Sequence, residues 1–338
     1  MFLNTGIFRR SSENERTRVV RAKDLARVPS PLGAHEAFLA AYERMSKLAR
    51  LARRPAMLVA AVDGSARVVE AVLVAAGQSL IIGRHTSCGL RLPSDTISLR
   101  QLAVHVWSES PDATPETRLW DLNTEQPFLT EDGEPNAAVI AQGTLYAAVG
   151  EYALLFVPTR GAHESPWPAR AEQAWKALPP RHFVDQRTPT GSRFRHSRRP
   201  LRPDGQEYHT RITRVGPLLM LGENEQPEDA WASLRLVVER KSEEHRISLS
   251  RLEQGVLLGR YERCGIPLAE LDHVSRVHLL LVRMGGDVLA IDTVSTNGTW
   301  RGPARIQTTT LGETDSLTLG EVLQIDWRRL SRRAPGED

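Results

Sequence analysis

The chain has 338 residues and a nearly balanced charge, with 44 Lys and Arg against 41 Asp and Glu and a formal net charge of +3. This length predicts about two domains with additional segments. The small positive excess does not amount to the basic surface typical of a nucleic-acid-binding protein. No stretch approaches the roughly 18 consecutive apolar residues of a membrane span, and the first residues lack the charged-then-apolar order of a secretion signal.

Cysteine usage points to a reducing compartment. The chain has two cysteines, Cys88 and Cys264, which are too few for a disulfide framework in a chain of this length. A cytoplasmic protein is therefore the simplest interpretation.

The N-terminal segment, residues 1–54, is predicted to form a polar tail followed by a helix. Apolar side chains recur at helical spacing over residues 34–54, which indicates an amphipathic helix. Ser30 is a candidate N-cap, and Pro31 suits the first turn. The apolar face consists of Phe38, Leu39, Tyr42, Met45, Leu48 and Ala52.

Two stretches of the chain are similar to each other. Gly83-Arg84 and Gly259-Arg260 are 176 positions apart, and the same shift without gaps aligns Cys88 with Cys264. Such self-similarity indicates a duplicated domain, which we place at residues 55–158 and 230–330. The paired cysteines are then predicted to be equivalent core positions, because free cysteine behaves mainly as a small buried apolar residue.

Both copies are predicted to be all-β. In the second copy, short apolar or alternating runs occupy residues 234–238, 256–258, 277–282 and 288–291, and Gly, Asp, Asn and Ser separate them. Short strands at this spacing are typical of a β-sandwich. We therefore expect two β-sandwiches in tandem.

The segment between the copies, residues 159–229, is rich in Pro and Arg. Nine arginines and three acidic residues lie between Arg181 and Arg214. This composition predicts an exposed linker, with local order near residues 215–221.

The second copy carries three short motifs in order: Gly259-Arg260, Ser275-Arg276-Val277-His278 and Thr296-Asn297-Gly298. A phosphorylated side chain carries between one and two negative charges and three acceptor oxygens. It needs a fixed cation, which the planar guanidinium of an arginine supplies, together with hydroxyl and amide donors. The ordered set therefore predicts a phosphate-binding site built on loops.

With these motifs, the chain resembles the forkhead-associated (FHA) domain family, strongly over residues 232–328 and weakly over 56–157. Members of that family fold as an eleven-stranded β-sandwich of two sheets. They bind phosphothreonine peptides with the loops at one end, and they are not enzymes. The resemblance implies this set of phosphopeptide-binding residues: Arg260, Ser275, Arg276, Thr296 and Asn297.

The same resemblance assigns supporting roles to three further residues. Gly259 would let the chain turn tightly, and Gly298 would complete an Asn-Gly turn. His278 would brace the loops through internal hydrogen bonds rather than contact the ligand. Asn297 would hold the peptide backbone beside the phosphothreonine.

The first copy departs from this pattern. Its equivalents in the gapless alignment are Gly83, Arg84, Leu99, Arg100 and Leu102, with Leu99 at the serine position and Leu102 at the histidine position. Ser98 lies one residue early, and a slip of one residue turns a side chain to the other face of a strand. Residues 125–127, Glu-Gln-Pro, replace Thr-Asn-Gly, and the glutamate would repel a phosphate.

We interpret the first copy as a degenerate module that kept its core and lost phosphothreonine recognition. Two alternatives stay open. The copy could bind a partner, namely helix 34–54 or the other copy. Alternatively, it could form a shifted phosphate site with Arg84, Arg100 and Ser98.

The leading functional hypothesis is a phosphothreonine-dependent adaptor or scaffold in serine/threonine kinase signalling. Its partner would be a phosphothreonine-containing protein, such as a kinase or a kinase substrate, with neither a membrane nor a nucleic acid involved. No P-loop, no nucleophile paired with a base and no metal-ligand cluster is found in the sequence, so we expect no enzymatic activity, cofactor or metal. One alternative is a polyanion- or nucleic-acid-associated protein that uses Arg181–Arg214, and another is a purely structural scaffold.

Overall fold

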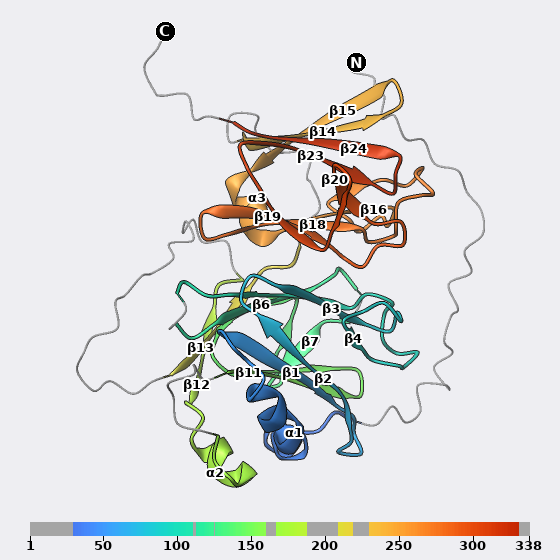
Figure 1. Cartoon of the computed structure of the whole chain (residues 1–338). Helices are drawn as coiled ribbons and strands as arrows, with labels where there is room; N and C mark the ends of the chain where they lie inside the picture. Colours follow the sequence, from blue (N-terminus) through green and yellow to red (C-terminus); the bar gives the residue numbers. More distant parts are fainter. Residues whose placement is uncertain are drawn as a thin grey trace. The chain divides into compact units, whose positions relative to one another are not determined.

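The computed structural model describes residues 30–110, 113–124, 126–159, 167–187, 209–218 and 230–330. Contacts divide the described chain into two compact units, one within Arg21–Pro217 and one within Leu218–Asp338. Both consist mainly of strands (Figure 1), which confirms the all-β prediction. None of the helices in the described part of the chain has the length and hydropathy needed to cross a bilayer.

The N-terminal unit is a sandwich of two sheets. The first sheet has the order β2 (Val68–Ala75), β1 (Ala56–Val62), β11 (Tyr152–Pro158), β10 (Leu145–Val149), β7 (Phe128–Thr130) and β8 (Pro135–Asn136). The second sheet has the order β12 (Arg181–Asp185), β13 (Thr210–Val215), β9 (Ala138–Gln142), β6 (Glu116–Asp121), β5 (Leu102–Trp107), β3 (Ser79–Gly83) and β4 (Leu90–Arg91).

The C-terminal unit is also a two-sheet sandwich. One sheet has the order β15 (Lys241–Ser248), β14 (Ala230–Val238), β24 (Leu323–Arg329), β23 (Thr314–Leu319), β20 (Thr299–Arg301) and β21 (Ala304–Ile306). The other has the order β17 (Ile266–Pro267), β16 (Val256–Gly259), β18 (Leu279–Met284), β19 (Asp287–Asp292) and β22 (Thr308–Leu311). A short helix, α3 (Leu249–Gln254), joins β15 to β16.

The strand orders of the two units coincide. When β1 to β11 are matched one by one with β14 to β24, each sheet of the first unit contains the equivalents of one sheet of the second in the same order. The tandem repeat of eleven-stranded sandwiches is thus confirmed at the level of topology. The N-terminal unit differs by the two additional strands β12 and β13, which extend one sheet beyond β9.

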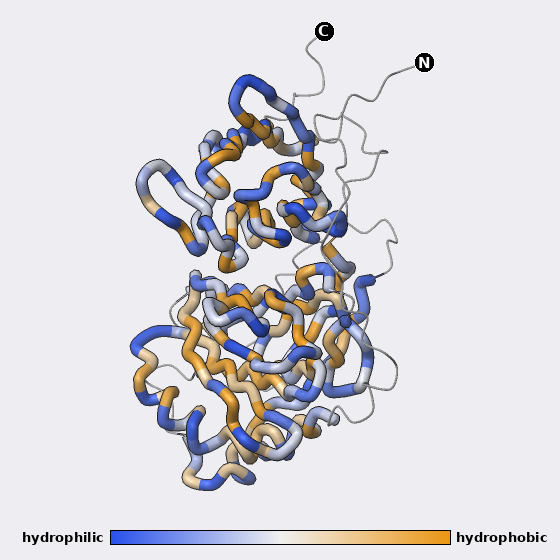
Figure 2. Tube along the Cα trace, turned by 90° about the vertical axis from the view of Figure 1, so that its right-hand side faces the viewer, coloured by the Kyte–Doolittle hydropathy of each residue, from blue (hydrophilic) through white to orange (hydrophobic). Residues whose placement is uncertain are grey.

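Each unit has its own apolar core between its sheets, and Figure 2 shows the hydrophobic segments gathered inside each of them. Cys88 and Cys264 are both free and buried. Burial raises the pKa of the Cys88 thiol to about 11 and that of Cys264 to about 12. Because the thiolate is the reactive form, both cysteines serve as core residues, as the repeat predicted.

The predicted N-terminal helix is present as α1 (Ala34–Ala49) and packs on the N-terminal unit (Figure 1). Strand β1 is buried on both faces: Met57 faces the sandwich core, and Leu58 packs with the helix. The helix buries Phe38, Tyr42 and Met45. Burial of such side chains stabilises by about 1.5–3 kcal/mol each, so the helix is an integral part of this unit.

The bounds of this helix differ from the prediction. It ends at Ala49 rather than residue 54, and Leu51 is exposed beyond its end. Its N-cap is Gly33, which provides no side-chain cap, so the prediction that Ser30 caps the helix was wrong. Leu32, just before the helix, also packs on the same apolar cluster.

The segment 159–229 is not a linker throughout. It contains α2 (Ala171–Lys176) and strands β12 and β13. Strand β13 pairs antiparallel with β9, and β12 pairs parallel with β13. The high Arg and Pro content obscured two short strands whose apolar residues, Phe183 and Ile212, join the sandwich core.

Candidate functional site

The loop after β16 is held against the loop before β18. The backbone N–H of Arg260 donates to Ser275 O at 3.0 Å, and that of Tyr261 donates to Arg276 O at 2.9 Å. A Cβ atom at Gly259 would lie 2.2 Å from Arg276 O, a distance that no side chain tolerates. Gly259 is therefore required because the two loops approach so closely.

The guanidinium of Arg260 is oriented by its own loop neighbours. Its Nε donates to Val274 O at 2.7 Å, and its Nη1 lies 3.6 Å from the carboxylate of Asp272. The Arg260 side chain is 30% exposed, whereas that of Asp272 is 93% exposed. A solvent-exposed carboxylate at this distance is weakly bound, so an anionic ligand can replace it.

Ser275 and Thr296 join two loops at the same place. Ser275 is buried, and its Oγ accepts a hydrogen bond from the backbone N–H of Thr296 at 3.0 Å. The two hydroxyl oxygens are 3.5 Å apart. The structure thus brings the motif of β17–β18 next to the motif of β19–β20.

His278 lies fully buried beneath these loops. Its Nδ1 accepts from the backbone N–H of Ser275 at 3.0 Å, and its Nε2 lies 3.2 Å from Gly298 O. The tautomer with the proton on Nε2 satisfies both contacts, because Nδ1 then accepts and Nε2 donates. This geometry matches the bracing role that the resemblance implied for His278.

Asn297 spans two loops. Its Nδ2 donates to His273 O at 2.9 Å, and its backbone oxygen accepts from Trp300 Nε1 at 3.1 Å. The side chain is half-buried. Next to Ser275 in sequence, Arg276 is exposed, and its backbone oxygen is held by Tyr261.

The β19–β20 loop is shaped by side chains that were not among the predicted site residues. The buried carboxylate of Asp292 accepts from Ser295 N at 2.8 Å, from Ser295 Oγ at 2.5 Å and from Thr299 Oγ1 at 2.7 Å. Within the loop, Gly298 has φ +80°. An Asp at a strand end with Ser three residues later is a signal for such a side-chain-capped turn.

The equivalent loops of the N-terminal unit align differently from the gapless comparison. The backbone N–H of Arg84 donates to Ser98 O at 2.9 Å, that of His85 to Leu99 O at 3.1 Å, and that of Gln101 to Ile82 O at 2.9 Å. These bonds repeat those made by the backbone N–H groups of Arg260, Tyr261 and His278.

Ser98 therefore corresponds to Ser275, and Leu99 corresponds to Arg276. The assignment of Leu99 to the serine position and of Leu102 to the histidine position was wrong, and Arg100 does not take the place of Arg276. The reason is a one-residue deletion: Ser98 follows Arg84 by 14 positions, and Ser275 follows Arg260 by 15.

Gln101 takes the structural place of His278. It is fully buried, its Oε1 accepts from Ser98 N at 2.9 Å, and its Nε2 donates to Gln126 O at 3.1 Å. Gln126 and Pro127 follow where the C-terminal unit has Asn297 and Gly298. Glu125, predicted to repel a phosphate, lies outside the described residues.

An eleven-stranded sandwich with a polar cluster on its loops defines the class of the C-terminal unit. The model of the FHA domain family matches residues 256–320, which include strands β16 to β23 and all three motifs. The C-terminal unit therefore contains an FHA domain, and the resemblance inferred from the motifs is confirmed there.

Solved structures similar to this chain include further FHA domains. The chain is 24% identical to Mycobacterium tuberculosis Rv1747 FHA-1, with 30% of this chain and 98% of that chain covered and a TM-score of 0.24. It is 28% identical to the FhaA FHA domain complexed with the intracellular domain of Rv3910, with coverage of 29% and 99% and a TM-score of 0.25. The chain matches none of the curated proteins.

Proposed function

We propose that the C-terminal FHA domain binds phosphothreonine peptides and that the chain acts as a non-catalytic adaptor or scaffold in serine/threonine kinase signalling. The observation that carries this proposal is the convergence of the Arg260 guanidinium, the Ser275 and Thr296 hydroxyls and the Asn297 carboxamide on neighbouring loops. These groups are donors that a phosphate dianion and an adjacent peptide backbone require.

The roles follow from the contacts. The Nε bond of Arg260 to Val274 O fixes the guanidinium plane, so its distal nitrogens are pre-oriented for a phosphate. Ser275 is held by His278 from below, which positions its hydroxyl beside the same group. Asn297 is partly exposed, and its carboxamide has a second N–H and an oxygen besides the N–H that donates to His273 O. These groups can bond a peptide backbone.

The alternative of a polyanion-binding arginine segment has little support in the described part of the chain. The Nε atom of Arg181 lies 2.8 Å from the Glu131 carboxylate, and Arg214 pairs with Asp132. Arg187 pairs with Asp185 at 2.5 Å. These three arginines are therefore paired within the protein. The arginines at 193, 195, 198, 199 and 202, on which the alternative also rests, lie outside the described residues.

The proposal is tested by titration of the full chain with one peptide in three forms, carrying phosphothreonine, phosphoserine or plain threonine. We expect the phosphothreonine form to bind most tightly. Each charge-assisted hydrogen bond contributes about 1.5–3 kcal/mol, so Arg260→Ala should weaken binding at least about tenfold. The control is Arg240→Ala, an exposed arginine in the β14–β15 turn. Equal binding of all three peptides, or equal binding by both variants, would contradict the proposal.

A further inference from the structure

The N-terminal unit orients an arginine in the same way as the C-terminal unit. Arg84 Nε donates to Ile97 O at 3.0 Å, as Arg260 Nε donates to Val274 O at 2.7 Å. In each unit, Nη1 also lies near one exposed carboxylate, that of Asp95 at 3.5 Å in the first unit. The cation of the phosphate-binding motif is therefore preserved together with the contacts that fix its direction.

The close approach of the loops is preserved as well. A Cβ atom at Gly83 would lie 2.5 Å from Leu99 O, just as one at Gly259 would meet Arg276 O. Ser98, the counterpart of Ser275, is held by Gln101 through its backbone N–H. The deletion before Ser98 shortens the loop without displacing the serine from its position.

The first unit adds a second arginine that the C-terminal unit lacks. Arg91 pairs with Gly83 in the parallel β3–β4 ladder, at the position where Pro267 pairs with Gly259. Its Nε donates to the backbone oxygen of Arg84 at 3.3 Å. The exposed Arg91 side chain is thus anchored directly beside Arg84.

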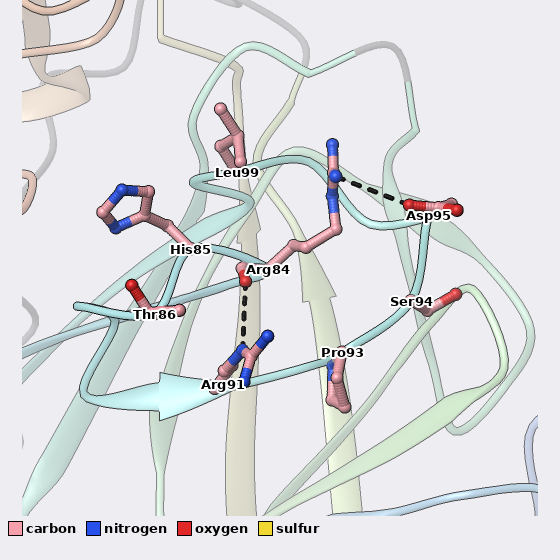
Figure 3. A pocket seen from close by; sticks show the side chains of 8 residues that line it. All are labelled: Arg84, His85, Thr86, Arg91, Pro93, Ser94, Asp95 and Leu99. Carbon is pink, nitrogen blue, oxygen red and sulfur yellow. Dashed lines mark hydrogen bonds and ion pairs between the residues drawn. The ribbon is translucent and has the colours of Figure 1, made fainter.

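These residues line an open hollow of ≈ 380 Å³, which Figure 3 shows from close by. In Figure 3 the Arg84 guanidinium extends toward Asp95, whereas the Arg91 side chain lies against the backbone oxygen of Arg84, so the two cations border different parts of the hollow. Pro93 and Ser94 border it between Arg91 and Asp95. The remaining lining residues are His85, Thr86 and Leu99. The hollow is larger than a single phosphate requires and includes apolar lining from Leu99 and Pro93, so it suits a phosphorylated side chain with part of its peptide.

The acidic groups at this site are few and weakly held. Asp95 faces Arg84 but its side chain is 95% exposed, so water screens this ion pair. The Glu70 carboxylate accepts from the backbone N–H of Arg91 at 2.7 Å, which leaves the Arg91 guanidinium for other partners. Of the two carboxylates, Asp95 is the one that an incoming phosphate displaces.

We propose that Arg84 and Arg91 form a second phosphate-binding site, in the N-terminal unit, for a phosphorylated side chain of a polypeptide. This site goes beyond the proposed function of the C-terminal domain and does not depend on Arg260. It has no counterpart of Arg276, whose position Leu99 occupies. Arg91 supplies a second cation instead, but Glu125 stands in the sequence where the C-terminal unit has the Thr296 hydroxyl. We therefore expect this site to bind more weakly than the Arg260 site.

The test uses the full chain with Arg260→Ala, which removes the key cation of the C-terminal site. We expect a phosphopeptide titrated into this variant at low salt to show residual, saturable binding. Adding Arg84→Ala or Arg91→Ala should weaken this binding at least tenfold. The matched control is Arg67→Ala, an exposed arginine of the same unit that pairs with Asp63.

Three outcomes decide against the proposal. The first is an absence of binding by the Arg260→Ala variant while the unsubstituted chain binds, which leaves the C-terminal function intact. The second is an equal effect of Arg91→Ala and Arg67→Ala. Arg91→Ala is the safer variant because its side chain is exposed, and an unchanged unfolding midpoint shows that it folds. The third is competition by inorganic phosphate as strong as by the peptide, which overturns the polypeptide ligand.

Discussion

His278 and Gln101 occupy the same position in the two units with different chemistry. Both side chains are fully buried, and both accept from the backbone N–H of the serine three residues earlier. His278 also contacts Gly298 O before β20, and Gln101 contacts Gln126 O before β7. A carboxamide has one acceptor and one donor end, as a neutral imidazole has. Either side chain therefore satisfies the buried groups of two loops.

This equivalence leads to a prediction for substitutions of His278. His278→Ala should leave the Ser275 N–H without its partner, whereas Gly298 O keeps the backbone N–H of Gly320 at 3.0 Å. An unsatisfied buried group costs about 1–3 kcal/mol. His278→Gln should recover part of that loss, because Gln101 performs the same task in the other unit. Chemical denaturation and phosphopeptide titration of both variants check this. Equal losses in the two variants would show that the ring itself is required.

At the level of residues, the C-terminal motifs could be predicted from the sequence. The gapless alignment of the two copies, however, placed the N-terminal serine and histidine equivalents one residue too late. Gly, Arg and Ser can be read directly because each has one chemical role in the motif. The position of Ser98 could not be read, since only the hydrogen bonds of the Arg84 backbone show where the chain is one residue shorter. A gapless comparison cannot detect a deletion in a loop that keeps its ends fixed.

Among the elements, strands β12 and β13 are attached to the N-terminal unit by packing and by charge. The acidic turn between β7 and β8 provides Glu131 for Arg181 and Asp132 for Arg214. The guanidinium of Arg214 also lies 4.7 Å from the ring centroid of Phe183. The Arg214 side chain is only 8% exposed. Its buried positive charge is therefore compensated by the carboxylate of Asp132.

Removal of that partner should destabilise the N-terminal unit. Asp132→Ala leaves the buried Arg214 without its carboxylate, and we expect a loss of about 1–3 kcal/mol in the free energy of unfolding. The control is Glu43→Ala on α1, which breaks an exposed pair with Lys47 that is worth about 0–1 kcal/mol. Denaturant unfolding compares the two. If Asp132→Ala is no more destabilising than Glu43→Ala, strand β13 is held by its backbone pairing and apolar contacts alone.

These strands also show why the element order was only partly predictable. The amphipathic spacing of α1 and the alternation in the β-strands reflect burial, so both appear in the sequence. In 181–185 no residue is fully buried, and in 210–215 Arg214 is itself buried, so neither segment shows a clear alternation of apolar and polar residues. The carboxylates that pair with Arg181 and Arg214 come from a turn about 50 to 80 residues earlier in the sequence. Composition alone therefore favoured a linker.

For the whole molecule, the separate cores imply separate responses to ligand. The strand pairs of β14 to β24 lie within the C-terminal unit, as do the residues of its core. A ligand that binds only the folded form stabilises by RT ln(1 + [L]/Kd), about 2.7 kcal/mol at a concentration one hundred times Kd. At such a concentration for the Arg260 site, the gain should fall on the unfolding of the C-terminal unit.

Calorimetry of the full chain with and without a phosphothreonine peptide measures this. We expect the transition of the C-terminal unit to move to higher temperature, and this shift to disappear in Arg260→Ala. The transition of the N-terminal unit is identified by its displacement in Asp132→Ala, and it should move less because its site binds more weakly. A single transition that shifts as a whole with the peptide would show that the two units unfold together, so that binding to one stabilises both.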